Sequence, residues 1–419
     1  MKQLSQFYKT KYFQILFAIF AFLVVYYRRT EIILDPQFWA EDGAAWFANA
    51  YNLGAFKSLF LVQDGYFQTL SRIVAIVAML FPIIKAPLIF NFSALIVQIL
   101  PAIFLLSSRF EKLISNFNIR ILLVLLYLFL PNTAEISGNI TNAQWFLALL
   151  AFMVLIAKSS DRKSWKIFDF LVLLLAGLSG PFSILLLPIA FFIWFYKRKK
   201  SYFQNFIIIF STAAVQIFGI FYLDGGERIA IIPDITVKLF FSIFARQIVW
   251  GSLIGVNGYM WILNNISWYF IFFAFSTFLA LVLIVYALFK SLFELKLFII
   301  FGLLIFISSL ISPTGLPKDH ELEFLSQLTT GNRYWMIPMC SFLVTLVWGL
   351  SRKSHIVIKI ISAMFLTTAI YGAVVDFHHL KFVDYQFRSE IEKFEDFPSG
   401  HQMSIPINPY GWEMELIKR

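Results

Sequence analysis

Apolar stretches close to 20 residues long recur along almost the whole chain. A helix needs about 20 such residues to cross the roughly 30 Å hydrocarbon core of a bilayer, where every backbone polar group must be bonded within its own segment. We therefore predict an all-α, polytopic transmembrane helical bundle with about eleven spans. The expected spans lie near residues 12–27, 87–107, 120–131, 145–158, 166–178, 183–196, 204–223, 268–289, 297–312, 334–350 and 360–376.

Composition excludes an ordinary soluble domain. The chain is 60% hydrophobic and only 14% charged, whereas soluble domains are about half apolar and a quarter charged. A membrane β-barrel would show short alternating segments, and the sequence has none. The single cysteine, Cys340, rules out an intramolecular disulfide framework.

The distribution of charge predicts the orientation. Three lysines precede the first apolar stretch and no small-residue cleavage site follows it, so we expect an uncleaved first helix with its N-terminus in the cytoplasm. The predicted inner segments then hold 19 of the 34 Lys/Arg and 4 of the 24 Asp/Glu, which leaves 15 and 20 on the outer side. This is the pattern of the positive-inside rule. It accounts for the net charge of +10, and we reject binding to nucleic acid.

One apolar segment, residues 67–84, is long enough to span, but counting it would invert every later loop. We assign it as an interfacial or re-entrant helix, with 40–52 as a second helix along the surface. The transmembrane module is then 1–376, with a first outer loop at 28–86. The remaining 377–419 form a short extracytoplasmic tail, too small for a core of its own and expected to fold against the outer loops.

The first outer loop contains an adjacent acid pair, Glu41-Asp42, between aromatic residues. Carboxylates at a bilayer edge are costly unless something polar is handled there, and a carboxylate can act as general base toward a hydroxyl. Successive helical residues point about 100° apart, so only one of the two can face a cleft. The alternative is an acid pair that stabilises a helix N-terminus.

A polar run between two predicted helices, residues 135–145, holds side chains suited to sugar hydroxyl groups: Asn139, Asn142 and Gln144. Polar groups placed in this way usually line a cavity. Helix capping by Asn142 or Thr141 is the alternative.

Outer-side cations are the third feature. Arg333 enters a predicted helix beside Tyr334 and Trp335, where a guanidinium could hold a phosphate with two hydrogen bonds, and Lys318 or His320 would add charge. The alternative is an interfacial anchor. Arg72 and Arg246 lie in apolar stretches, so each needs an anionic partner, a carboxylate or a lipid phosphate.

A metal site has little support in the sequence. His378-His379 closes the last predicted span, but no ligand spacing accompanies the pair, so we interpret it as a surface pair. We assign no cofactor and no metal ligands, and leave a divalent metal open.

Five strings together resemble the GT-C superfamily of multi-span glycosyltransferases, and most nearly the bacterial serotype-converting O-antigen glucosyltransferases. They are Phe38-Trp-Ala-Glu-Asp-Gly43, Asn139-Ile-Thr-Asn-Ala-Gln-Trp145, Leu178-Ser-Gly-Pro-Phe182, Gly331-Asn-Arg-Tyr334 and Ile405-Pro-Ile-Asn-Pro-Tyr-Gly-Trp412. They extend over nearly the whole chain. Relatives with a large soluble outer domain differ from this chain, whose tail is short.

The resemblance implies an enzyme that transfers a hexose or pentose from a polyprenyl-phosphate-linked donor. The acceptor would be a cell-envelope glycan or lipid, such as lipopolysaccharide, on the extracytoplasmic face of a bacterial inner membrane. Asp42, or less favoured Glu41, would be the general base. The resemblance further implies donor-phosphate ligands at Arg333, Lys318, His320 and Arg72, and a sugar or acceptor site at Asn139, Asn142, Gln144 and Trp39.

Two other functions stay open at this stage. A lipid-linked oligosaccharide polymerase or ligase would use the same lipid substrate. A non-enzymatic transporter or flippase of amphiphiles would be expected to show repeat symmetry and ionisable residues in the middle of its helices, and the sequence has no internal repeat.

Overall fold

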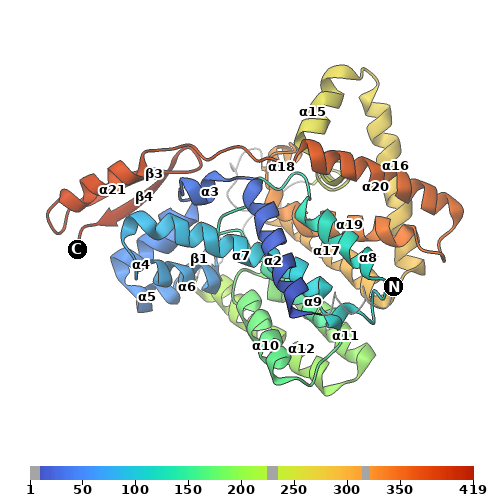
Figure 1. The fold of residues 1–419 in the computed structure, drawn as a ribbon, viewed down its shortest axis with the longest axis horizontal. Helices are drawn as coiled ribbons and strands as arrows, with labels where there is room; N and C mark the ends of the chain where they lie inside the picture. Colours follow the sequence, from blue (N-terminus) through green and yellow to red (C-terminus); the bar gives the residue numbers. More distant parts are fainter. Residues whose placement is uncertain (1–9, 224–234, 314–320) are drawn as a thin grey trace.

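The computed structural model describes residues 10–223, 235–313 and 321–419 and is mostly helical (Figure 1). Within these residues five helices are long and apolar enough to cross a membrane, or six if a bent pair at 237–265 is one span. The membrane character expected from composition is therefore present. The number of spans stays a prediction, because the other apolar helices are shorter.

Each apolar stretch expected to span forms a helix. These helices are α2 (Lys11–Tyr27), α7 (Ala86–Leu106), α8 (Phe117–Leu128), α9 (Ala143–Ile156), α10 (Lys163–Gly177), α11 (Phe182–Lys197), α12 (Lys200–Phe218), α16 (Tyr269–Lys290), α17 (Phe293–Ile311), α19 (Asn332–Gly349) and α20 (Ile356–Val375). Short helical turns η3 (Ser108–Phe110) and η4 (Gly219–Leu223) follow α7 and α12. Polar residues cap several starts: the Asn116 side chain, for example, accepts from the Asn118 N–H at 2.9 Å.

The expected first outer loop is built from short elements. They are α3 (Glu31–Leu34), the π-helix η1 (Asp42–Phe47) that continues into α4 (Ala48–Leu53), α5 (Ala55–Leu59), the strand pair β1 (Val62–Gln63) and β2 (Tyr66–Phe67), α6 (Thr69–Ala78) and η2 (Ile83–Lys85). Helix α6 has 10 residues and so rises about 15 Å. That is half the hydrocarbon thickness, which agrees with an interfacial or re-entrant helix.

Residues 224–267 lie between two of the expected spans and were expected to form a long outer loop, but their described part is mostly helical. Residues from 237 form α13 (Val237–Ile243), the π-helix η6 (Phe244–Trp250), α14 (Gly251–Leu253) and α15 (Gly255–Asn265), with a bend of 109° before α15. Buried Ile248 and Trp250 anchor this segment, and the Gln247 amide donates to the Leu325 carbonyl at 2.7 Å, on α18 (Glu321–Leu325). The sequence did not predict these helices, because polar residues and glycines interrupt the apolar stretch.

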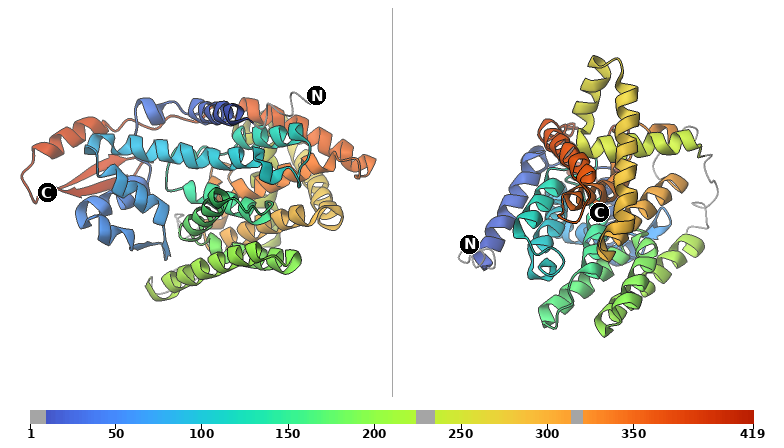
Figure 2. Two further views of the ribbon diagram at one scale, coloured as in Figure 1. Left: turned by 60° about the horizontal axis from the view of Figure 1, so that its bottom comes forward. Right: turned by 90° about the vertical axis from the view of Figure 1, so that its right-hand side faces the viewer.

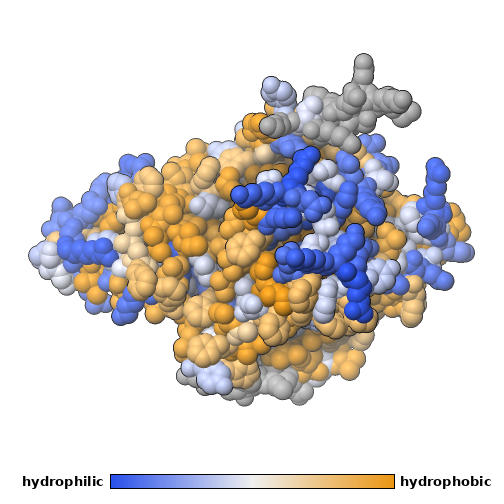
Figure 3. All heavy atoms as spheres, turned by 90° about the horizontal axis from the view of Figure 1, so that it is seen from below, coloured by the Kyte–Doolittle hydropathy of each residue, from blue (hydrophilic) through white to orange (hydrophobic). Residues whose placement is uncertain are grey.

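Helix α15 and the first turns of α16 project from the bundle as an antiparallel pair (Figures 1 and 2). Their surface carries large exposed apolar side chains such as Ile271 and Phe275. The face of the molecule seen in Figure 3 is also largely apolar, with hydrophilic side chains gathered in groups. Such surfaces are expected of a protein that contacts lipid.

The C-terminal segment packs on the first outer loop. It contains α21 (Phe387–Asp396) and an antiparallel hairpin of β3 (Gln402–Ile407) and β4 (Trp412–Ile417), at the left end of Figure 1 beside α4 to α6. The Asn408 N–H donates to the Phe38 carbonyl at 3.2 Å, and the Asn52 side chain donates to the Glu415 carbonyl at 2.8 Å. The structure thus joins the tail to the segment that holds the acid pair.

Two buried arginines link the segments expected outside. Arg28 donates to the carbonyls of Leu128, Leu130 and Phe377 at 3.2, 2.8 and 3.1 Å. Arg29 donates to those of Ala134, Ser137 and Leu380 at 3.1, 3.2 and 2.8 Å. The ends of α2, α8 and α20 are therefore held together.

Segments expected inside are likewise joined to one another. Arg109, after α7, pairs with Asp169 on α10 at 2.8 Å, and Lys197 at the end of α11 pairs with Glu294 on α17. Each of these two ion pairs joins segments that are both expected on the cytoplasmic side. Side chains that contact each other must lie on the same side of a membrane, so the ion pairs agree with the expected orientation.

Candidate active site

The Asp42 carboxylate is fully buried and fixed by the polar run at 135–145. One oxygen accepts from the Ile140 N–H at 3.0 Å and the other from the Thr141 N–H at 2.8 Å. Burial raises the pKa of Asp42 to about 7, although these hydrogen bonds oppose the rise. Asp42 therefore fastens the start of η1 to the polar run.

Trp46 makes a second link between the same segments. Its indole N–H donates to the Thr141 hydroxyl at 2.8 Å. Asp42 and Trp46 are four residues apart, so they share one helix face. This face of η1 is directed at the polar run.

Glu41 lies in different surroundings from Asp42. It is partly exposed, and Arg333, Asp64 and Glu135 act on it electrostatically. Burial raises the pKa of Glu41 above its ordinary value, with Asp64 and Glu135 adding to the rise and Arg333 opposing it. Of the two acids, Glu41 is the one close to a cation.

Arg333 forms an ion pair with Glu135 of the polar run. The Arg333 guanidinium donates to the Glu135 carboxylate, and another of its nitrogens donates to the Tyr334 hydroxyl at 3.3 Å. The ion pair thus joins the start of α19 to the polar run that precedes α9.

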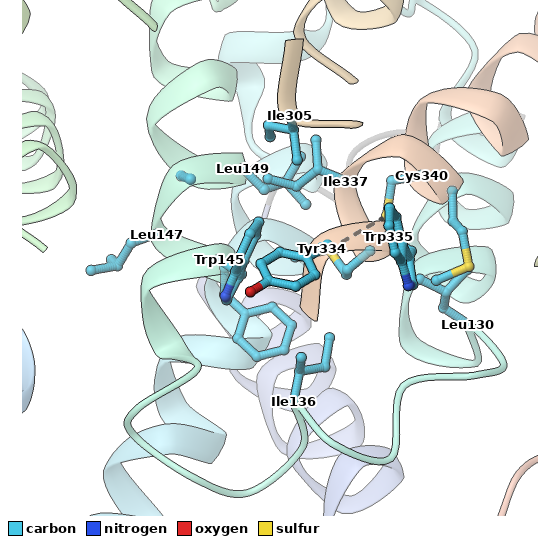
Figure 4. Close-up of a cluster of buried hydrophobic side chains, with 14 of the residues drawn as sticks. Leu130, Ile136, Trp145, Leu147, Leu149, Ile305, Tyr334, Trp335, Ile337 and Cys340 are labelled. Atoms are coloured by element: carbon cyan, nitrogen blue, oxygen red, sulfur yellow. Dashed lines mark hydrogen bonds between the residues drawn. The ribbon is translucent and has the colours of Figure 1, made fainter. Parts of the chain in front are cut away.

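Aromatic rings cover the next turn of the bundle below this charged cluster. The rings of Trp145 and Tyr334 lie 5.5 Å apart, and Phe182 lies 4.6 Å from Trp145. Figure 4 shows Trp145 on α9 and Tyr334 on α19 facing each other, with Ile337 and Ile136 on either side. Trp145 Nε1 is buried without a partner among the described residues, as is common where a polar ligand or water belongs.

The three amides that the sequence singled out are used largely within their own loop. Asn139 and Asn142 both donate to the Glu135 carbonyl, at 2.7 and 3.2 Å, and Gln144 donates to the Thr141 carbonyl at 3.2 Å. Asn142 does not cap α9 with its side chain. These bonds shape the loop that presents Glu135.

Arg72 on α6 is fully buried, and its guanidinium lies 4.9 Å from the centre of the Trp46 ring. None of its three guanidinium nitrogens has a hydrogen-bond partner in the described part of the chain. One turn earlier, the Gln68 side-chain oxygen is also buried without a partner there. An unpaired buried guanidinium is costly, so this position suits an anion.

The other predicted site residues lie elsewhere. Trp39 stacks on Phe382 at 5.0 Å and bridges to Asn408, so it packs against the C-terminal segment. Arg246 donates to the Ser326 carbonyl and hydroxyl, each at 3.4 Å, and none of the ion pairs among the described side chains includes it. Lys318 and His320 lie outside the described residues.

Of the histidine pair, His378 is exposed and His379 is partly exposed. The His379 Nε2 atom is buried, and the His379 backbone N–H donates to the Arg28 carbonyl at 2.8 Å. Over the described residues, no group of three or more His, Cys, Asp or Glu side chains is arranged to hold a metal ion.

Sequence reasoning missed the role of Glu135 as the partner of Arg333 and the presence of Asp64 near Glu41. Both are acids in segments expected on the outer side, and this shared location is the feature of the sequence that could have indicated a role at the site. The contact between Glu135 and Arg333 joins positions 198 residues apart.

Comparisons with known proteins do not assign the chain to a family. No family model matches the chain, and neither a curated protein nor a solved structure is significantly similar to it.

Proposed function

We propose that this protein is a membrane glycosyltransferase of the GT-C type. It would move a sugar from a polyprenyl-phosphate donor to a cell-envelope glycan or lipid acceptor on the extracytoplasmic face. The observation that carries the proposal is the cluster of Arg333 with Glu41, Asp64 and Glu135 at one end of an apolar bundle. Charged groups kept at a membrane surface suit the polar head of a lipid-borne substrate.

Glu41 is the general base in this proposal. Both Asp42 oxygens are occupied by backbone N–H groups and the side chain is fully buried, so Asp42 acts as a positioning residue. Glu41 is partly exposed and its raised pKa brings it closer to neutral pH, where a carboxylate base is effective.

The reaction is a displacement at the anomeric carbon. Glu41 accepts the proton of the acceptor hydroxyl, whose oxygen bonds to the anomeric carbon as the bond from that carbon to the phosphate oxygen breaks. Polyprenyl phosphate leaves with the bonding electron pair. Arg333 stabilises the charge that develops on the phosphate, and Glu135 orients the Arg333 guanidinium.

Arg72 is the second cation available to the donor phosphate. Its guanidinium, which has no hydrogen-bond partner in the described part of the chain, would donate to the oxygens of a phosphate, whereas the Arg333 guanidinium already donates to Glu135. Reaching Arg72 requires a local opening near Trp46, because its nitrogens are buried.

The test compares cell-envelope glycans by mass spectrometry in the source organism. The strains carry the wild-type gene, a deletion, or Glu41→Gln, with Glu392→Gln on the exposed face of α21 as the matched control. We expect the deletion and Glu41→Gln to lose the same glycan modification while the control keeps it. Unchanged glycans in the deletion strain would contradict the proposal.

A transporter of the same lipid is separated from the enzyme by an assay without a membrane barrier. Detergent-solubilised protein, polyprenyl-phosphate sugar and envelope extract should yield free polyprenyl phosphate if the protein is a transferase. A transporter would release none.

A further inference from the structure

An apolar groove of about 440 Å³ lies between α7, α8 and α9 on one side and α17 and α19 on the other. Its walls are almost entirely hydrocarbon side chains, among them Leu122, Phe152, Phe298 and Val344. It lies away from the charged cluster, and the proposed sugar transfer does not use it. Apolar walls of this kind favour contact with hydrocarbon over contact with water.

The length of the groove matches one leaflet of a bilayer. Along α19 its lining runs from Cys340 to Trp348, about 12 Å of helix rise, and it continues past the end of the helix to Ser351. Half of the roughly 30 Å hydrocarbon core is about 15 Å. A single acyl chain of a membrane lipid therefore has the length that the groove accepts.

The groove has polar lining residues, Ser115, Asn116 and Ser351, at the end expected in the cytoplasm. The exposed cations Arg352 and Lys353 directly follow Ser351 in the sequence. The acid in the lining, Glu294, is paired with Lys197. This charge complements an anionic headgroup, and anionic lipids concentrate in the cytoplasmic leaflet.

The opposite end of the groove is closed toward the charged cluster. The lining stops at Leu149 and Cys340, and one or two turns further on Trp145, Tyr334 and Ile337 fill the space between α9 and α19 (Figure 4). A lipid with its phosphate at Arg333 cannot pass its chain through this plug. The headgroup of the occupant therefore lies at the other end, beside Ser351.

We propose that the groove binds an anionic phospholipid of the inner leaflet, with an acyl chain between α8 and α19 and the headgroup phosphate at Arg352 and Lys353. The bound chain would fill the space between the two halves of the bundle. This site is separate from the proposed sugar transfer, so either can fail without the other.

Native mass spectrometry of the purified chain, titrated with phosphatidylglycerol or phosphatidylcholine, tests the proposal. The groove variants are Val344→Trp and, from the exposed rim, Ile119→Trp; the control is Val285→Trp on the outward face of α16. We expect wild type and control to retain one phosphatidylglycerol. Each groove variant should reduce the bound fraction at least tenfold.

The charge at the mouth is tested with the double variant Arg352→Gln, Lys353→Gln against Lys199→Gln, Lys200→Gln, another exposed basic pair. Only the first should lower the preference for phosphatidylglycerol over phosphatidylcholine. Equal binding of the two lipids by wild type would overturn the proposal, and so would unchanged binding in both groove variants. Displacement of phosphatidylglycerol by polyprenyl phosphate would assign the groove to the donor lipid instead. Thermal unfolding of each variant in detergent checks that it folds.

Discussion

Asp42 and Thr141 are 99 residues apart in the sequence, yet the Asp42 carboxylate accepts the Thr141 backbone N–H at 2.8 Å. The sequence alone leads us to expect that Asp42→Asn keeps the fold and loses only activity. The structure predicts otherwise, because the asparagine NH₂ group would face a buried N–H. An unsatisfied buried donor costs about 1–3 kcal/mol.

We therefore predict that Asp42→Asn lowers the thermal unfolding midpoint of the detergent-purified protein. Asp396→Asn, on the exposed end of α21, is the control and should leave the midpoint unchanged. Equal midpoints for wild type and Asp42→Asn would show that the two backbone hydrogen bonds do not stabilise the fold.

The pH dependence of transfer is predicted from the surroundings of Glu41. A general base works in its deprotonated form, so the rate falls as the pH drops through its pKa. Burial, Asp64 and Glu135 raise the pKa of Glu41. As the pH is lowered, activity should therefore begin to fall at a pH higher than the ordinary glutamate pKa of about 4.3. The measurement is kcat/KM against pH with a polyprenyl-phosphate sugar.

Asp64→Asn tests the cause of that shift. It removes one of the negative charges that disfavour the ionised form of Glu41, so the acidic limb should move to lower pH. Asp396→Asn should leave the limb where it is. If the acidic limb of the pH profile does not move in Asp64→Asn, the group that titrates is not Glu41, and Asp42 is the first alternative.

The helices of the bundle were largely predictable because a long apolar run marks a helix without any need for periodicity. Their ends were less so: the segment expected at 67–84 is helical only to Ala78. The helices within 237–265 were missed, because Arg246 and Gln247 interrupt an apolar segment that tertiary contacts keep helical. Gln247 bonds to carbonyls near 325, a partner that the sequence does not reveal.

The site was predictable as a set of residues but not as a geometry. Glu41, Asp42 and Arg333 stand out since charge is rare in this chain. Which acid is enclosed and which meets the cation depends on backbone N–H groups at 140 and 141, which look alike in every sequence. The three amides looked like ligands, whereas most of their hydrogen bonds stabilise the loop itself.

Arg28 is predicted to be a structural residue that lysine cannot replace. Its guanidinium donates to four backbone carbonyls from two other segments, those of Leu128, Leu130, Asp376 and Phe377, and a lysine ammonium lacks the planar fork that reaches them together. Because hydrogen bonds from a charged group contribute about 1.5–3 kcal/mol each, Arg28→Lys should lose a few kcal/mol in total. The half-life of the folded protein in detergent at raised temperature should fall, and that of exposed Arg352→Lys should not.

Gly255 and Gly400 form a matched pair that separates backbone strain from steric contact. Both have positive φ, +64° and +88°, so alanine at either position costs about 1–2 kcal/mol. At Gly400 nothing lies within 4 Å of an added Cβ, whereas at Gly255 the Cβ would lie 2.6 Å from the Asp376 carboxyl carbon.

Asp376 has little freedom to move away. Its carboxylate accepts from the backbone N–H groups of Asn132 at 2.7 Å and Asn257 at 3.3 Å. We therefore predict that Gly255→Ala lowers the thermal midpoint several times more than Gly400→Ala. Similar losses in the two variants would mean that the bend before α15 can relax without disturbing Asp376, and that α15 is held to α20 more loosely than these contacts indicate.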